Sequence, residues 1–494
     1  MKTKLNILIL ILFVFPSVIF SQTFKRISLE DLWLNYSFYP ERAEDIVPMN
    51  DGEHYLILLD EYTIVRYSYK SSQAVDTLVT KEMLKPVDGQ TAIQIESFEI
   101  NQKETALLLK TNSEAIYRHS EIASYFVFEL STKNLFAVSE GKKQRLAEFS
   151  PDGDMVAYIS GNNLFCSDIR TGIELQITND GLQNNILNGT TDWVYEEEFS
   201  FTKAWHWSPD SKKIAFIRFD ESKVKEYQLI MYGDLYPEQY KYKYPKAGED
   251  NSLVSVWICD LTEFSKPILK SIDIGNETDI YIPRICWTAD PGKLAVFRMN
   301  RLQNKLDILM ADATTGNTKT FYTQENKSYI EITDNFKFTE NGKYFFIMSE
   351  EDGFNHVYRY DINGKLINQV TKGQWDVKEI KAIDEKNAVI YYISAESNPV
   401  NRDLYSVGFD GSNKSKIFKK EGTWEAEFSK NCAYFTGTFS DANTPPIIAI
   451  YNNKGKEIQA LTDNKKLAEK ANEYGFTKKE FFSFNTSGNI RLNG

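Results

Sequence analysis

Three adjacent carboxylates lie between aromatic side chains in residues 192–199, whose sequence is DWVYEEEF. A run of acids is most often the solvated face of a helix. Carboxylates held beside apolar groups also attract a cation, because an unpaired buried charge is costly. The aromatic flanks, together with a second feature upstream, favour a cation-binding site made by Glu196, Glu197 and Glu198.

The second feature is Arg118, in the sequence Tyr-Arg-His-Ser at residues 117–120. A guanidinium group is a planar fork that binds a carbonyl or carboxylate in a fixed orientation. An ordinary surface arginine is an equally reasonable interpretation of this residue alone. Combined with the glutamates, it would give a site with an acidic and a basic end, which matches the ammonium and the nearby carbonyl of a peptide's free N-terminus.

The composition describes a folded protein of 494 residues with 42% hydrophobic and 14% aromatic residues, which is enough for a sizeable core. The formal net charge of −12 argues against a nucleic-acid partner, which would need a basic surface. The N-terminus carries Lys2 and Lys4 before an apolar run at residues 5–15. This pattern predicts a signal peptide over residues 1–21, too short to span a membrane, and hence an exported protein, periplasmic or secreted, with no membrane span after its removal.

Metal and cofactor sites are not expected. The four histidines are far apart in sequence, and no CxxC or HxxxH spacing occurs. The four cysteines, Cys166, Cys259, Cys286 and Cys432, are widely spaced, so small buried residues on strands are a better interpretation than a disulfide framework, although export would permit pairing.

An internal repeat determines the expected fold. Its unit is an apolar residue, a polar turn and a strand of alternating pattern, such as residues 155–159 or 213–217. Eight copies of the turn occur, at residues 49–52, 100–103, 149–153, 207–210, 287–290, 338–342, 383–386 and 428–431. A recurrence of roughly 40 to 60 residues with about four strands per unit is typical of a β-propeller. We therefore expect an all-β chain that forms an eight-bladed propeller of four-stranded antiparallel blades.

The interval between the fourth and fifth turns leaves room for an extra hairpin near residues 230–252, which is rich in tyrosine. These tyrosines could cover a partner surface or fold back on their own blade, and the sequence does not distinguish the two. Helical periodicity is confined to short segments such as residues 29–33 and 465–473.

A catalytic set is missing from the sequence. None of the 25 glycines begins a G-x-S-x-G nucleophile elbow, and neither a phosphate-binding loop nor a zinc-protease helix is present. The sequence motifs therefore indicate a binding function and show no recognisable catalytic nucleophile.

Several motifs, in the same order and through nearly the whole chain, resemble the dipeptidyl peptidase IV family of the prolyl oligopeptidase clan. They are LEDLW at 29–33, YRHS with the following ASY at 117–125, DWVYEEE at 192–198, YPKAGEDN at 244–251 and DGFNHVY at 352–358. In that family an eight-bladed propeller caps a C-terminal α/β-hydrolase domain, and the enzyme removes dipeptides, preferring proline or alanine at the second position, from free N-termini.

The resemblance implies that Glu197 and Glu198 bind the substrate ammonium and that Arg118 orients the carbonyl of the second residue. Two carboxylates around one ammonium would select for the length of the peptide's N-terminal end. A longer N-terminal extension would leave both carboxylates unpaired, at a cost of several kcal/mol. Which two of the three glutamates face the cavity stays open.

The resemblance also implies supporting roles. Trp193 and Tyr195 would buttress a short helix that carries the acids, and Glu196 would support its neighbours. A homodimer through the inserted hairpin is the family expectation.

The chain departs from the family pattern at its C-terminus, since it stops where family members enter the hydrolase domain. We expect a signal peptide at 1–21, a segment at 22–45 that would pack on the missing hydrolase, a propeller at 46–475 with its hairpin near 230–252, and the start of a truncated hydrolase domain at 476–494. The leading hypothesis is the substrate-recognition propeller of an exported serine dipeptidyl peptidase, inactive alone. The alternative is a non-catalytic propeller that binds a peptide or protein partner.

Overall fold

The computed structural model describes residues 24–86, 91–233 and 235–494. The expected signal peptide at 1–21 lies outside these residues. The described residues divide into two compact units, one within residues 24–41, 442–446 and 463–494, and one within residues 42–441 and 447–462.

The first unit contains two short helices and a hairpin. Helix α1 (Leu29–Trp33) and helix α3 (Lys465–Glu473) occur where the periodicity predicted them, and strands β37 (Ser483–Asn485) and β38 (Arg491–Asn493) pair antiparallel. Within this unit the backbone N–H of Lys25 donates to the carbonyl of Glu473 at 3.0 Å. The ring of Phe38 also packs edge-on against Tyr474 at 5.0 Å. The segment before the propeller is therefore tied to α3.

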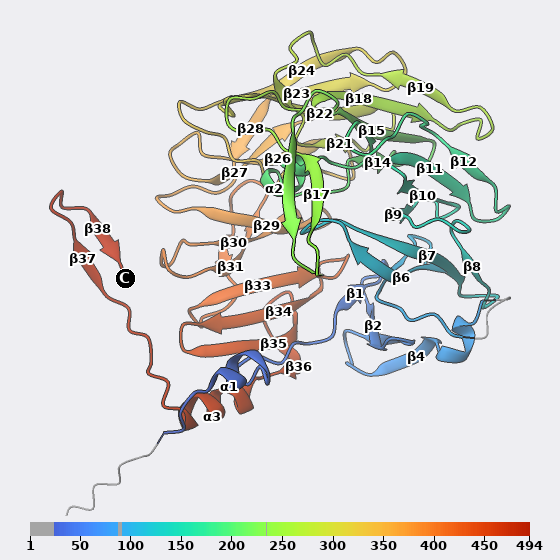
Figure 1. Cartoon of the computed structure of the whole chain (residues 1–494). Coiled ribbons are helices and arrows are strands. Elements are labelled where there is room, and N and C mark those ends of the chain that lie inside the picture. The colour runs from blue at the N-terminus through green and yellow to red at the C-terminus, as the bar shows by residue number, and fades with distance from the viewer. Residues whose placement is uncertain (1–23, 87–90, 234) are drawn as a thin grey trace, which may run out of the picture. The chain divides into compact units, whose positions relative to one another are not determined.

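The second unit is an all-β propeller of eight antiparallel sheets that follow one another around a ring (Figure 1). Six sheets have four strands in chain order, and the fourth and fifth have a fifth short strand. The predicted fold class and blade number are confirmed.

The first four blades consist of these strands: β1 (Ile46–Pro48), β2 (His54–Asp60), β3 (Thr63–Ser68) and β4 (Ala74–Val79); β5 (Ser97–Ile100), β6 (Ala106–Ala115), β7 (Glu121–Glu129) and β8 (Leu135–Ala137); β9 (Arg145–Phe149), β10 (Met155–Ser160), β11 (Asn163–Asp168) and β12 (Glu174–Gln176); β13 (Ile186–Asn188), β14 (Trp205–Trp207), β15 (Lys213–Asp220), β18 (Leu253–Asp260) and β19 (Ile268–Ser271). A 3₁₀ turn at Lys81–Leu84 follows the first blade.

The last four blades consist of these strands: β20 (Ile280–Tyr281), β21 (Ile285–Trp287), β22 (Lys293–Asn300), β23 (Lys305–Asp312) and β24 (Thr318–Glu325); β25 (Lys337–Phe338), β26 (Tyr344–Ser349), β27 (His356–Asp361) and β28 (Leu366–Gln369); β29 (Val377–Asp384), β30 (Val389–Ser394), β31 (Asp403–Gly408) and β32 (Ser415–Lys416); β33 (Thr423–Phe428), β34 (Tyr434–Asp441), β35 (Thr444–Asn452) and β36 (Glu457–Thr462).

The repeated polar phrase is a turn whose hydroxyl bridges the two inner strands of a blade. Ser150 accepts a hydrogen bond from the backbone N–H five residues later at 3.0 Å, and Ser208, Thr339 and Ser429 do the same at 2.9, 3.0 and 3.1 Å. The repeat seen in the sequence is therefore a recurrent hydrogen-bonding device that starts the second strand of the blade.

Side chains between neighbouring sheets form the core. The largest cluster joins blades four, five and six, and it includes Tyr195 and Phe199 from the acidic segment. The first and last blades meet through Tyr69 and Tyr434, whose rings stack with centroids 5.3 Å apart. This contact brings together residues at the two ends of the propeller sequence and closes the ring.

The cysteines are free thiols, and all except Cys286 are buried. Among the residues that the structure describes, no group of three potential ligands is placed to hold a metal ion. Within the same residues, no helix is long and apolar enough to cross a membrane.

Candidate functional site

The acidic segment interrupts the innermost strand of blade four. Strands β13 and β14 both pair with β15, and the insertion between them carries helix α2 (Trp193–Glu198). The N–H of Gly189 donates to Ile217 at 3.0 Å, and the N–H of Ile217 donates to Ala204 at 2.8 Å, so the sheet continues on both sides of the insertion. The blade thus holds both ends of the insertion that carries the helix.

Six residues are too few for a helix to be stable in isolation, so neighbouring blades must hold α2 in place. At its N-terminus, Asp192 Oδ1 accepts the backbone N–H of Tyr195 at 3.0 Å, the usual capping bond. The Ser252 hydroxyl donates to Asp192 Oδ2 at 2.5 Å. Burial raises the pKa of the Asp192 carboxyl, and these two donors act in the opposite direction.

Tyr195 anchors the helix to blade five. Its side chain is 1% exposed, its ring meets Phe219 edge-on at 4.8 Å, and its hydroxyl accepts the N–H of Ile282 at 2.9 Å. These contacts connect the middle of the helix to blades four and five.

The C-terminal end of α2 is held by Arg284. Its guanidinium donates to the carbonyl of Phe199 at 3.0 Å and to Asp334 at 2.7 Å, and it lies 4.7 Å from the ring centre of Phe201. A cation at this end also complements the partial negative charge of the last helical carbonyls. The helix is therefore fixed at both ends by side chains distant in sequence.

The three glutamates have different environments. Glu196 is 1% exposed and accepts the backbone N–H of His119 at 2.9 Å, which ties the helix to the segment that carries Arg118. The Glu197 side chain is 16% exposed, and Glu198 is exposed. Glu197 and Glu198 are therefore the two carboxylates that a ligand could reach.

Arg118 comes close to the first of these carboxylates. Its Nε lies 3.6 Å from Glu197 Oε1, and its side chain is 72% exposed. This distance is longer than a good hydrogen bond, and an exposed ion pair of this kind contributes little to stability. The guanidinium is thus positioned beside Glu197 and remains available to a ligand.

Trp193 contacts Tyr117 and the inserted hairpin. The hairpin consists of strands β16 (Glu226–Met231) and β17 (Glu238–Lys243). Trp193 lies 6.3 Å from the ring of Tyr117, nearly parallel to it, and 5.6 Å from the ring of Tyr242. Tyr117 and Tyr242 therefore both pack against Trp193, the first residue of helix α2.

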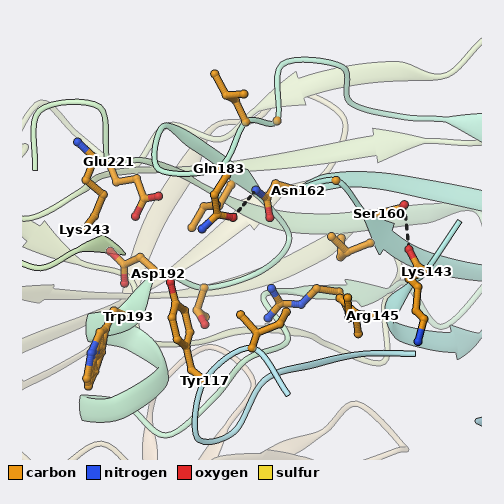
Figure 2. Close-up of a pocket in the computed structure, with 18 residues that line it drawn as sticks. Tyr117, Lys143, Arg145, Ser160, Asn162, Gln183, Asp192, Trp193, Glu221 and Lys243 are labelled. Atoms are coloured by element: carbon orange, nitrogen blue, oxygen red, sulfur yellow. Dashed lines mark hydrogen bonds between the residues drawn. The ribbon is translucent and has the colours of Figure 1, made fainter. Parts of the chain in front are cut away.

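A cavity of about 410 Å³ with a mixed polar and apolar lining adjoins the helix N-terminus, between residues of the second, third and fourth blades (Figure 2). Arg145 and Glu221 line it and are 9% and 4% exposed. Burial lowers the pKa of Arg145 and, together with the nearby charge of Asp192, raises the pKa of Glu221 to about 8. The Glu221 carboxyl is therefore mostly protonated at neutral pH.

Sequence reasoning missed Ser252, Ile282 and Arg284, and it missed the buried cavity residues Arg145 and Glu221. One available signal was the Tyr-Ile-Pro-Arg sequence at residues 281–284, where a proline breaks the strand pattern just before the fifth turn. In the structure this break separates β20 from β21 and faces helix α2.

Comparison with known proteins places this architecture in a recognised class. The family model described as "Dipeptidyl peptidase IV (DPP IV) N-terminal region" matches residues 101–446. A probable dipeptidyl peptidase 4 from Emericella nidulans is 26% identical over 95% of this chain and 62% of its own length. One from Aspergillus flavus is 27% identical over 91% and 60%.

Two solved structures share the fold. Dipeptidyl peptidase 4 from Porphyromonas gingivalis is 38% identical with a TM-score of 0.89, and it is matched over 95% of this chain and 66% of its own. A putative dipeptidyl aminopeptidase IV from Bacteroides ovatus, 22% identical with a TM-score of 0.73, agrees in fold. The chain spans about 60% of the length of the curated relatives.

The fold is an eight-bladed propeller of antiparallel blades. The chain belongs to the dipeptidyl peptidase IV N-terminal region family. The family resemblance inferred from the motifs is thereby confirmed.

Proposed function

We propose that this chain is the substrate-recognition propeller of an exported serine dipeptidyl peptidase, and that it binds the free N-terminus of a peptide. Glu197 and Glu198 bind the ammonium group, and Arg118 orients the carbonyl of the second residue. The observation that carries the proposal is the 3.6 Å approach of Arg118 to Glu197 on a helix whose two ends are fixed.

The geometry supports a different role for each of the charged groups Glu196, Glu197 and Arg118. Glu196 is buried and occupied by the N–H of His119, so it fixes the spacing between the helix and the arginine segment. An incoming ammonium would replace Arg118 as the neighbour of Glu197, which frees the guanidinium fork for a carbonyl oxygen. Binding therefore exchanges a weak exposed ion pair for two directed contacts.

The same arrangement supports specificity for the end of a peptide. An acylated N-terminus carries no ammonium, and an extended peptide carries its ammonium beyond the reach of Glu197, so in both cases the bound peptide would leave this carboxylate without an opposite charge. Hydrolysis would need a nucleophile, and no G-x-S-x-G nucleophile elbow occurs in these 494 residues. The chain alone is expected to bind without cleaving, and an Ala-Pro chromogenic amide should give no turnover.

A homodimer through the inserted hairpin is part of the proposal. The hairpin exposes a set of apolar and aromatic side chains, which are Leu229, Ile230, Met231, Tyr232, Leu235 and Tyr236. Exposed patches of this kind favour protein contact. Sedimentation of the native chain against a Tyr236→Lys variant tests this assembly.

The binding role is tested with an Ala-Pro peptide that carries a fluorophore at its C-terminal end. We expect acetylation of the peptide's N-terminus to weaken binding by about tenfold or more, because a hydrogen bond between charged groups is worth about 1.5 to 3 kcal/mol. Glu197→Gln should have a similar effect on the free peptide, while Glu457→Gln, an exposed change on blade eight, should have none. Equal affinity for the free and acetylated peptides would contradict the proposal.

A further inference from the structure

The inserted hairpin touches both halves of the candidate site through one residue. The strand β16 is exposed along its whole length, whereas Tyr242 on β17 is only 6% exposed. The ring of Tyr242 lies 6.1 Å from that of Tyr117 and 5.6 Å from that of Trp193. A side chain of a projecting hairpin is therefore buried between two other elements.

Those two elements are the ones that present the charged groups. Tyr117 immediately precedes Arg118, and Trp193 is the first residue of helix α2, four positions before Glu197. Figure 2 shows Tyr117 and Trp193 on the same side of the cavity, next to Asp192. The ring of Tyr242 completes a three-way aromatic contact with them.

Other hairpin tyrosines strengthen this contact. Tyr240 meets Tyr117 edge-on at 6.2 Å, and Tyr244 lies 5.6 Å from Trp193. The base of the hairpin is tied down separately, since Lys243 donates to the carbonyl of Val224 at 2.7 Å. The aromatic contact is thus a firm connection between the hairpin and the site.

The connection matters because Arg118 has little else to hold it. Its side chain is 72% exposed, and its approach to Glu197 is too long for a strong bond. The bond from the His119 N–H to Glu196 fixes one point of the segment, and the ring of Tyr117 fixes a second point on the other side of Arg118. Two fixed points flanking Arg118 define where its backbone lies.

We propose that Tyr242 is a positioning residue, whose ring between Tyr117 and Trp193 sets the distance between Arg118 and the carboxylate of Glu197. The inference rests on the proposed function, because it concerns the affinity of that same site for a free N-terminus. It assigns the hairpin a role within the site of its own chain, in addition to any contact with a partner. Burial raises the pKa of Tyr242, with Glu197 among the neighbouring charges, which agrees with this proximity.

The test is equilibrium binding of the labelled Ala-Pro peptide to variants of the full chain. Tyr242→Leu keeps an apolar side chain but removes the ring, and we expect about tenfold weaker binding, which is what the loss of one hydrogen bond from the Arg118 guanidinium would cause. Tyr242→Phe keeps the ring and should bind as the native chain does. Tyr39→Leu, at a residue 63% exposed and outside the hairpin, is the matched control and should not change affinity.

A double substitution separates positioning from a general structural effect. If Tyr242 acts through Arg118, then Tyr242→Leu should cause no further loss in a chain that already carries Arg118→Ala. Because Tyr242 is buried, Tyr242→Leu should also cost some stability, so binding to every variant is measured well below its melting temperature.

Three outcomes would overturn the inference. The first is native affinity in Tyr242→Leu while Arg118→Ala binds weakly, which would refute positioning and leave the proposed function intact. The second is an equal loss from Tyr242→Leu with and without Arg118, which would show an independent effect. The third is native affinity in both Arg118→Ala and Glu197→Gln, which would overturn the proposed function and this inference together.

Discussion

The cavity beside helix α2 makes stability depend on pH through one carboxyl group. Glu221 is 4% exposed, and its pKa is raised from 4.5 to about 8 by burial and by the charge of Asp192, against a smaller opposing effect of Lys243. The folded state therefore holds a proton that the unfolded state releases between these two values. Stability from this residue is present below pH 4.5 and is lost as the pH rises towards 8.

The magnitude follows from the size of the shift. One pKa unit corresponds to about 1.4 kcal/mol, so a change from 4.5 to about 8 gives an upper bound of about 5 kcal/mol across the window. Glu221→Gln keeps the shape and hydrogen-bonding capacity of the neutral carboxyl but cannot ionise. The free energy of unfolding of this variant should therefore fall less steeply than that of the native chain between pH 5 and pH 8.

Urea denaturation, followed by tryptophan fluorescence at several pH values, measures this difference. Glu226→Gln, an exposed change on strand β16, controls for the loss of one acid and should leave the native slope unchanged. The reasoning is refuted if Glu221→Gln and the native chain lose stability in parallel over the whole window.

Further predictions concern the supports of helix α2 and the thiols. Asp192→Ala removes the capping bond and should destabilise the chain by about 1 to 2 kcal/mol, whereas Asp192→Asn keeps an accepting oxygen and should cost less; urea midpoints distinguish them. Arg284→Met strands the carbonyl of Phe199, should cost about 1 to 3 kcal/mol, and should also weaken peptide binding, which anisotropy measures. Burial raises the pKa of Cys432 to about 11 and that of Cys166 well above its ordinary value, so neither thiol should react quickly with iodoacetamide in the native protein at pH 8, as mass spectrometry of the intact chain would show.

Much of the fold was predictable because it is repetitive. The same hydrogen bond, from a backbone N–H to the turn hydroxyl, recurs at Ser150, Ser208, Thr339 and Ser429. Each copy of the turn therefore makes the assignment of the other copies as blade turns more secure. The location of the acids on a short helix was also predictable, since the family motif and the local sequence agree.

The supports of the site were not predictable in the same way. Ser252 bonds to a residue 60 positions away, Ile282 to one 87 positions away and Arg284 to one 85 positions away. Such contacts depend on how adjacent blades pack against each other. The hydrophobic periodicity of one strand indicates only that strand's own secondary structure and buried face, so it cannot predict them. The buried position of Glu196 has the same origin, because the N–H that it accepts comes from another blade.

The central claim is that the Glu197 carboxylate meets the ammonium group of a peptide. The most direct measurement is a cycle in which the native chain and Glu197→Gln each bind the free and the N-acetylated Ala-Pro peptide. The account predicts that acetylation weakens binding to the native chain and has little effect on Glu197→Gln, because the partner of the ammonium is already gone. An equal loss on acetylation in both proteins would contradict it.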